Sequence, residues 1–493
     1  MAPLVSISDF LSNFWEQLCT IGSPMMFYNG LFWFLMLLFL PIYAMLKNRR
    51  YQMMMFVALF SIFFAYKASG WVCLFMIATA LIDWFIAKKI ATIGIKKEKK
   101  LLATVAIVLS LGLLIFFKYT NFLLSNLSTI AQRNFQPLDL VAPIGISFYT
   151  FRTISYIVDV YKGKCAPAED WLEYLFYLTF FPCLIAGPVV RAKDFLPQIR
   201  ENKSADKAMI YGGLYLFLIG VVKKALFADY ISQYVNIAFG NPAGYSGFEL
   251  FMASVGYSLQ LYCDFSGYSD MAIGLGAILG YNLGINFDFP FRSLNITEFW
   301  RRWHITLSFW IRDYLYIPLG GNRKGKIRQY INLMVSMLLG GLWHGASWNY
   351  IIWGGGHGVA LCIHKAFKKP LDKVKNSGVV KFFSWLLTFL VCNFLFVFFR
   401  AESFAEAKAV LGGIFTNFDL AYLPPFVSAR VLLCIMIVIV FALHFVPQRF
   451  YDKLRGYFVA APWIVKLLVM AAVIALVLHF ASADVKPFIY AQY

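Results

Sequence analysis

The sequence predicts an all-α integral membrane protein, a multi-span helical bundle with interfacial and re-entrant helices. Of its 493 residues, 60% are hydrophobic and only 14% are charged, which is well below the charged share of ordinary soluble domains. Apolar runs long enough to cross a bilayer recur along the chain, and they give roughly ten to twelve spans. Because these runs show no alternation with a period of two residues, helices are expected and not a β-barrel.

The predicted spans follow one another along most of the chain. Ahead of the first span, Phe10, Phe14 and Leu18 recur at helical spacing, which predicts an interfacial helix within residues 1–26. No cleavable signal peptide is expected, because the first twenty residues lack a basic segment and contain two carboxylates. The clearest spans are residues 27–46, 71–87, 101–117, 382–399, 431–446 and 463–480.

Positive charge is concentrated in short segments between the predicted spans. The formal net charge is +19, and cytoplasmic loops of membrane proteins carry an excess of lysine and arginine. We therefore expect these segments to face the cytoplasm and both chain termini to lie outside. Membrane lipid is the expected surrounding, and no nucleic-acid partner is predicted. The basic segments are residues 47–50, 88–100, 322–328, 365–375 and 449–455.

The first break in the apolar pattern places Arg152 and Asp159 inside a span-like run. Pro182, Gly187 and Pro188 follow, and they would end any helix there. Two interpretations stay open. One is a non-helical segment surrounded by protein or by a water-filled cavity, and the other is a kinked span whose Arg152 snorkels to the surface.

The second break, residues 261–274, combines hydroxyl groups with two carboxylates. It contains Asp264, Ser266, Tyr268 and Asp270. The carboxylates are six residues apart, so they do not share one face of a continuous helix, and a paired acid/base site is not indicated. A capped helix break, in which Asp264 and Ser266 bond freed backbone N–H groups, is favoured over direct chemistry.

The third break, residues 293–328, begins with Asn295 and Glu298, a pair spaced to cap a helix. Trp300, Trp303 and further apolar residues continue at helical spacing. This pattern predicts one amphipathic helix in the membrane interface, with its tryptophans at headgroup level.

His344 ends a helix-like apolar run and is flanked by Gly341 and Gly345. Glycines let another backbone or a ligand approach closely, so we expect an open site around this imidazole. A buried imidazole is neutral near pH 7, as a general base must be.

The remaining histidines and the cysteines have simpler explanations. No acidic residue or pair of cysteines lies near the histidines at a sequence spacing typical of metal sites, so no metal is expected. The eight cysteines are scattered and are expected to pack in the core. A structural histidine bonded to a carbonyl is a better description of His357, His364, His444 and His479 than of His344.

Several motifs in order resemble the membrane-bound O-acyltransferase superfamily. They are "APIGISFYTFRTISYIVDVYKG", "FFPCLIAGPVVR", "LYCDFSGYSDMAIGLG", "FDFPFRSLNITEFWRRWHITLSFWIRDYLYIPLGGNRKG" and "LLGGLWHGASWNYIIWGGGHG". The resemblance is to the branch that acetylates alginate, with the branch that transfers D-alanine to teichoic acid as a more distant relative. It covers residues 27–400, while residues 401–493 fit only in the number of spans, and it implies one membrane domain.

The resemblance implies a funnel or tunnel through the membrane, with His344 as the catalytic residue. His304 stands at a second polar position upstream, where Asn, Asp or His is usual. The expected donor to the oxyanion is His304, a tryptophan indole or a backbone N–H exposed by the glycines. Candidates for substrate or tunnel contacts are Trp303, Trp343, Asp264, Ser266, Tyr268, Asp270, Asn349 and His357. Candidates for contacts to the donor phosphates are Arg323, Lys324, Lys326 and Arg328.

The implied activity is an O-acetyltransferase of the bacterial cytoplasmic membrane. Acetyl-CoA is the expected donor, and acetyl would cross the bilayer to an exported polysaccharide such as alginate, with an exported acetyltransferase of the SGNH type as partner. Two alternatives are kept. One is a related acyltransferase that uses another donor on a cell-wall polymer, and the other is a transporter or flippase, which the lack of an evident inverted repeat disfavours.

Overall fold

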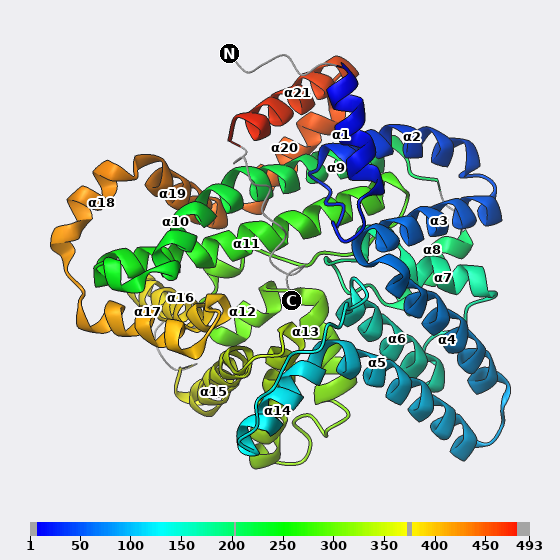
Figure 1. Ribbon diagram of the computed structural model, residues 1–493, viewed down its shortest axis with the longest axis horizontal. Coiled ribbons are helices and arrows are strands. Elements are labelled where there is room, and N and C mark those ends of the chain that lie inside the picture. The colour runs from blue at the N-terminus through cyan, green and yellow to red at the C-terminus, as the bar shows by residue number, and fades with distance from the viewer. Residues whose placement is uncertain (1–6, 202–203, 372–376, 481–493) are drawn as a thin grey trace. The chain divides into compact units, whose positions relative to one another are not determined.

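The computed structural model describes residues 7–201, 204–371 and 377–480, and within these ranges the chain forms helices joined by loops, with no strand (Figure 1). The predicted all-α class is confirmed. Residues 1–6 of the predicted interfacial segment and residues 372–375 of one basic segment lie outside the described ranges. The apolar chain reaches this result because a helix satisfies its own backbone hydrogen bonds inside lipid.

The chain divides into two compact units. The first is Met1–Ile210 with Gly276–Leu283, and the second is Tyr211–Leu275 with Gly284–Tyr493. The helices that lie wholly within the first unit are α1 (Ile7–Cys19), α2 (Gly30–Leu46), α3 (Arg50–Ser69), η1 (Gly70–Cys73), α4 (Leu74–Thr92), α5 (Lys96–Ile130), α6 (Ile146–Tyr161), α7 (Trp171–Thr179), η2 (Phe181–Cys183) and α8 (Ala192–Glu201).

Two helices, α9 (Lys207–Val221) and α11 (Gly247–Ile278), belong for most of their length to the second unit. The others there are η3 (Val222–Ala228), α10 (Asp229–Gly240), η4 (Pro242–Gly244), η5 (Pro290–Arg292), α12 (Ile296–Arg302), α13 (Ile305–Ile311), η6 (Arg312–Tyr316), α14 (Lys326–His344), α15 (Trp348–Leu371), α16 (Gly378–Arg400), α17 (Phe404–Thr416), η7 (Leu420–Tyr422), α18 (Leu423–Ala429), α19 (Val431–Phe445), α20 (Gln448–Ala460) and α21 (Trp463–Phe480).

Four stretches within the described part are long and apolar enough to cross a membrane, and six are if each of two bent helix pairs counts as one span. This number is smaller than the ten to twelve spans expected, because several buried helices are short or carry polar side chains. The four stretches are Arg50–Thr92, Lys96–Ile130, Lys207–Gly240 and Gly378–Arg400. The bent pairs are Leu420–Ala429 with Val431–Phe445, and Gln448–Ala460 with Trp463–Val477.

In the first unit, Arg152 on α6 does not snorkel. Its side chain is buried and donates to the carbonyls of Tyr177, Leu178 and Cys183, where α7 gives way to η2. A guanidinium carries five N–H donors, so it satisfies carbonyls that the end of the helix leaves without partners. The structure therefore supports the interpretation of non-helical backbone surrounded by protein.

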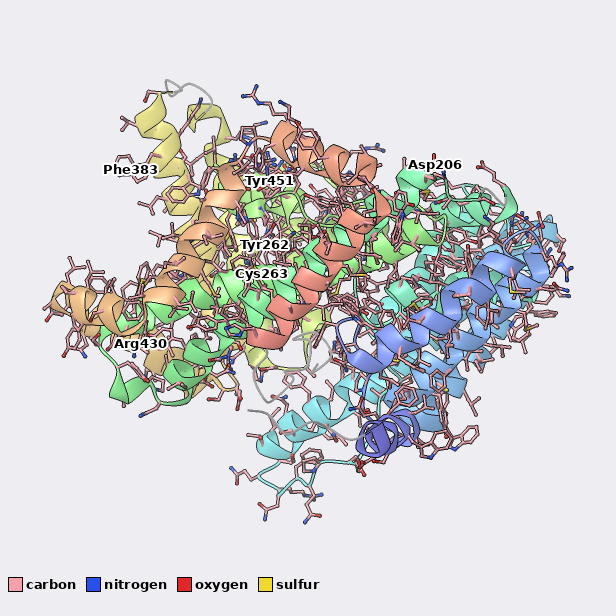
Figure 2. All side chains as sticks on the ribbon, turned by 90° about the horizontal axis from the view of Figure 1, so that it is seen from above. Asp206, Tyr262, Cys263, Phe383, Arg430 and Tyr451 are labelled. Carbon is pink, nitrogen blue, oxygen red and sulfur yellow. The ribbon has the colours of Figure 1, made fainter. Side chains whose placement is uncertain are left out.

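In the second unit, α11 is continuous through residues 261–274, so the expected helix break there is wrong. A methyl group added at Gly220 would lie 2.5 Å from the carbonyl oxygen of Gly267, which means that α9 and α11 pack backbone to backbone. The break is unnecessary because the carboxylates of this stretch pair with lysines across that contact. Tyr262 and Cys263, which lie next to each other on α11, are marked in Figure 2.

The predicted amphipathic helix in residues 293–328 is two helices, α12 and α13. Asn295 caps α12 as expected, since its Oδ1 accepts from the backbone N–H of Glu298 at 2.9 Å. The chain breaks at His304, whose φ of 43° lies in the left-handed region. Trp303 is fully buried within the protein, and its ring centroid lies 5.5 Å from that of Phe299.

Arg430 marks the bend between α18 and α19, two helices that meet at 101° (Figure 2). Its guanidinium lies 4.9 Å from the ring centroid of Tyr234 and 5.1 Å from that of Phe426. Cations are attracted to aromatic faces, and these contacts hold the bend in place within the second unit.

Candidate active site

His344 is the last residue of α14, and its ring is buried among aromatic side chains. The centroid of the imidazole lies 5.0 Å from those of Trp343 and Trp353 and 5.2 Å from that of Phe399. Only 3% of the residue is exposed. The expectation of an open site around His344 is therefore wrong, since three rings pack against the imidazole.

The glycines around His344 serve the packing of helices. A methyl group at Gly354 on α15 would lie 2.3 Å from the carbonyl oxygen of Met337, and one at Gly341 would lie 2.2 Å from that of Tyr350. Both distances are far below van der Waals contact, so only glycine lets α14 and α15 approach this closely. The close packing of α14 and α15 brings Trp353 against His344.

His304 belongs to the same aromatic cluster as His344. Trp343 contacts both, with its ring centroid 6.2 Å from that of His304 and 5.0 Å from that of His344. Phe265 on α11 packs edge-on against His304 at 4.7 Å. Burial lowers the pKa of His304 to about 3 because apolar surroundings disfavour the charged ring, so this imidazole is neutral at pH 7.

His357 extends the cluster along α15. Its ring contacts those of Trp300 at 5.1 Å and Trp353 at 4.9 Å, and it is fully buried. Neither ring nitrogen has a hydrogen-bond partner among the described residues, so the expected bond to a carbonyl is absent there. The indole N–H groups of Trp300 and Trp353 likewise have no partner within the described part. The cluster thus contains several buried polar atoms of the kind that bind a ligand or water.

Two other histidines have a hydrogen-bond partner within the protein, as a histidine with a structural role does. His444 Nδ1 lies 2.8 Å from the carbonyl oxygen of Val440, which confirms the expected bond to a carbonyl. His364 Nδ1 lies 2.9 Å from Oγ1 of Thr297, so its partner is a hydroxyl group. Neither contact places its imidazole against His344.

The carboxylates of α11 form ion pairs that the sequence analysis did not predict. Lys224 Nζ lies 2.6 Å from Asp264 and 2.8 Å from Asp229, and Lys223 Nζ lies 2.6 Å from Asp270. Charged groups at membrane depth are normally paired, so the two adjacent lysines within an apolar run were the signal that could have revealed these pairs.

Three other candidates have packing or structural contacts. Ser266 and Tyr268 are buried on α11. Asn349 Nδ2 donates to the carbonyl oxygen of Ala401 at 2.8 Å, at the end of α16. Asparagine therefore satisfies a helix C-terminus here.

The basic loop before α14 is exposed and lies outside the aromatic cluster. Arg323 and Lys324 lie on the turn between η6 and α14, and Lys326 and Arg328 lie in the first turn of α14; all four candidates are exposed. Exposed cations of this kind attract anions from solution without forming a defined site.

Asn286, which contacts His304 from a loop, is a further site residue that the sequence did not reveal. Its Oδ1 lies 3.0 Å from Nδ1 of His304. The two residues are 18 positions apart in the sequence with α12 between them, so no local pattern pointed to the contact. No group of three or more His, Cys, Asp or Glu within the described ranges is arranged to hold a metal ion.

A pocket of about 240 Å³ lies in the first unit, and none of the predicted site residues lines it. Its polar lining includes Tyr43, Lys47 and Gln198. The candidate site in the second unit is therefore defined by side-chain contacts and not by this pocket.

Known proteins resemble this chain over most of its length. A family model described as membrane-bound O-acyltransferase matches residues 169–399. The chain is 35% identical to the probable alginate O-acetylase AlgI of Pseudomonas putida, over 95% of this chain and 100% of that protein. It is 39% identical to the peptidoglycan O-acetyltransferase of Helicobacter pylori, over 69% of each chain.

A more distant relative transfers a different acyl group. The teichoic acid D-alanyltransferase of Bacillus subtilis is 30% identical, over 55% of this chain and 72% of that protein. The matched region of the family model contains His304, His344 and His357, the three histidines of the aromatic cluster. On these similarities and on its apolar helices, the chain belongs to the membrane-bound O-acyltransferase family and is an integral membrane enzyme that transfers acyl groups to oxygen.

Proposed function

We propose that this O-acyltransferase takes acetyl from acetyl-CoA in the cytoplasm and passes it across the bacterial inner membrane for O-acetylation of an exported polysaccharide. The observation that carries the proposal is the buried imidazole of His344, packed against Trp343 and Trp353 within the family's matched region. Relatives named for alginate and for peptidoglycan support an acetyl group and a glycan acceptor.

In the proposed reaction, His344 is the general base. It removes the proton of a hydroxyl group while the hydroxyl oxygen attacks the thioester carbonyl. Collapse of the tetrahedral intermediate breaks the C–S bond, and the proton passes from the imidazolium to the leaving thiolate. The products are an oxygen ester and a free thiol. The indole N–H of Trp353, whose ring lies against His344, would stabilise the oxyanion.

Donor and acceptor lie on opposite sides of the membrane in this proposal. The exposed basic loop with Arg323 and Lys324 would face the cytoplasm and attract the phosphates of coenzyme A. The oxygen ester formed in that reaction would carry acetyl through a funnel or tunnel in the membrane to an exported SGNH-type acetyltransferase, which completes the transfer to the sugar.

A second candidate keeps the chemistry and changes the donor. The similarity to a teichoic acid D-alanyltransferase favours an aminoacyl carrier protein acting on a cell-wall polymer. Release of free thiol from acetyl-CoA and from D-alanyl carrier protein, measured with the same purified enzyme, separates the two. Turnover of acetyl-CoA alone supports the first candidate, and turnover of the aminoacyl donor alone overturns it.

His344→Gln tests the catalytic assignment. Glutamine keeps polar atoms in the ring's place but cannot take up a proton near neutral pH, so thioester turnover should fall by about a hundredfold or more. The acetate content of the exported polymer should fall with it. The measurements are thiol release from membranes and polymer acetate, beside the melting temperature of the protein in detergent.

The matched control is His364→Gln on α15, a histidine with a hydroxyl partner outside the cluster. This variant should retain most of the turnover. If His344→Gln, inserted at the normal level, still acetylates the polymer, His344 is not the general base. His344→Ala is less informative, because it leaves space among three packed rings and destabilises the site.

A further inference from the structure

Asn286 connects three parts of the second unit through its side-chain amide. It is 1% exposed and lies in the loop between α11 and α12. Its Oδ1 lies 3.0 Å from Nδ1 of His304 and accepts from Oγ1 of Thr306 at 2.8 Å, and its Nδ2 donates to Oγ of Ser269 on α11 at 3.0 Å. Both the oxygen and the nitrogen of the amide therefore have partners. Which of the two faces His304 determines whether Nδ1 of the imidazole carries a hydrogen.

The backbone of Thr306 fixes the orientation of this amide. Its N–H points at Oδ1 of Asn286 from 3.4 Å, and a backbone N–H can only donate. If the amide were rotated by half a turn, its NH₂ group would face this N–H and two donors would meet. The oxygen of Asn286 therefore faces both Thr306 and His304.

Two protonation states of His304 suit this oxygen, the imidazolium and the neutral ring with its hydrogen on Nδ1, and burial disfavours the imidazolium. An amide oxygen accepts hydrogen bonds and does not donate them, so Nδ1 of His304 must carry the hydrogen. The ring is neutral, because burial lowers its pKa to about 3. A neutral imidazole with hydrogen on Nδ1 has an unprotonated Nε2, which accepts.

We propose that Asn286 is a positioning residue that holds His304 in the Nδ1–H tautomer, so that Nε2 accepts a hydrogen bond from the reacting molecules. The proposal rests on the function proposed above in one respect, namely that His304 contacts the molecules that react in the acyl transfer. It removes His304 from the three groups considered as donors to the oxyanion. The group that meets Nε2 carries an O–H or N–H, as an acceptor hydroxyl or the amide of a donor does, and an oxyanion is excluded from this position.

The backbone and the neighbouring rings also hold this imidazole in one orientation. His304 has a φ of 43°, a left-handed conformation that non-glycine residues rarely adopt and that clusters at functional sites. The carbonyl oxygen of Asn286 accepts from the N–H of Ile305 at 2.8 Å. Phe265 and Phe287 contact the ring at 4.7 and 6.3 Å between centroids, so rotation of the imidazole is obstructed.

A purely structural role for Asn286 makes a different prediction. Through its two oxygens the residue also satisfies the first N–H groups of α13, as a helix cap does. A cap requires an acceptor but is indifferent to the tautomer of the neighbouring ring. The tautomer itself is therefore the property to measure.

The test is nitrogen NMR of the purified protein labelled with ¹⁵N-histidine. The chain has six histidines, and the signals of His304 are assigned by their loss in His304→Asn. At pH 7 the wild type should show a protonated Nδ1 and an unprotonated Nε2. An Nε2–H tautomer or an imidazolium in the wild-type protein would overturn the proposal, and this measurement needs no variant at Asn286.

Variants at position 286 connect the tautomer to the reaction. Asn286→Asp keeps an acceptor oxygen and should keep the Nδ1–H tautomer and most of the turnover. Asn286→Leu is similar in size without an acceptor, so it should lose the tautomer. Its kcat should fall about a hundredfold or more with little change in KM, since a wrong tautomer of a catalytic histidine costs up to about 10⁴ in rate in serine hydrolases.

Ser269→Ala is the matched control. It removes the other partner of the Asn286 amide and leaves the bond between Oδ1 and His304 in place, so tautomer and turnover should persist. If the Asn286→Leu protein folds and loses the Nδ1–H tautomer but keeps full turnover, the tautomer of His304 is not needed for the reaction, and that part of the proposal is wrong. Retained activity in His344→Gln would sink the proposed function while the NMR result stands.

Discussion

His304 combines a left-handed backbone with a fully buried imidazole. Each feature costs stability by itself, and the hydrogen bonds that Asn286 accepts from His304 and Ile305 compensate for part of both. His344 differs, because it ends a regular helix and its ring is held by aromatic packing. The hydrogen bond to Asn286 thus adds to the ring contacts that hold His304 in place.

The buried neutral state of His304 should make the protein less stable in acid. The pKa of this ring is about 3 when folded and about 6.5 in an unfolded chain, so the unfolded chain binds the proton first. The stabilising contribution is complete above about pH 6.5 and is lost as the pH falls toward 3, by about 1.4 kcal/mol per pH unit. Melting temperatures in detergent at pH 7 and pH 4.5 measure this loss.

The control for the acid effect is His304→Asn, which removes the titrating ring. Asparagine tolerates a left-handed backbone better than most residues, so the variant should fold. Its melting temperature should fall less between pH 7 and pH 4.5 than that of the wild type. Equal falls in the two proteins would show that His304 does not set the acid stability.

At the scale of elements, the hairpin of α14 and α15 depends on glycine at the contact. Gly354→Ala should destabilise the protein by about 1 to 3 kcal/mol, because the new methyl group would lie 2.3 Å from the carbonyl oxygen of Met337. The helices would have to separate, and Trp353 would move away from His344. Melting temperature and thioester turnover should therefore fall together.

Gly412→Ala on α17 is the matched control for the hairpin. Nothing lies within 4 Å of a methyl group placed there, and alanine is favoured over glycine inside a helix by about 1 kcal/mol. This variant should be as stable as the wild type or more so. If both alanine variants behave alike, close packing of α14 and α15 does not determine the site.

For the whole molecule, the charge distribution predicts the orientation in the membrane. The basic loop around Lys324 should face the cytoplasm, because lysine and arginine are retained on that side, and α1 should lie outside. Cys19 on α1 is exposed, so a membrane-impermeant maleimide should label it in intact spheroplasts. Lys324→Cys, combined with Cys19→Ser, should be labelled only after permeabilisation.

Labelling of both positions from outside, or of neither, would contradict this orientation. The other seven cysteines are buried or partly buried, which keeps the background low. A reversed result, with Lys324→Cys labelled in intact spheroplasts and Cys19 protected, would invert the whole topology and place the basic loops outside.

Patterns of a few neighbouring residues predicted the features that depend on interactions between residues close in the chain. Composition and apolar runs predicted a helical membrane protein, and the Asn295 and Glu298 spacing predicted the start of α12. The position of His344 followed from its motif. Each of these features needs only neighbouring residues, because a helix closes its hydrogen bonds within four residues. The predicted helix through His304 failed, since apolar spacing contains no information about a single left-handed residue.

The sequence by itself therefore determined the class of protein, the family and the histidine on which the proposed chemistry depends. Only the tertiary structure decided which partners meet. Lys224 forms an ion pair with Asp264 of another helix, and Asn286 forms a hydrogen bond with His304 on the other side of α12. Gly354 lets the backbone of the neighbouring helix approach closely at Met337. These contacts join residues far apart in the chain, and their geometry is set by how the helices pack. A one-dimensional pattern cannot specify that packing, although the residues that make each contact are all visible in it.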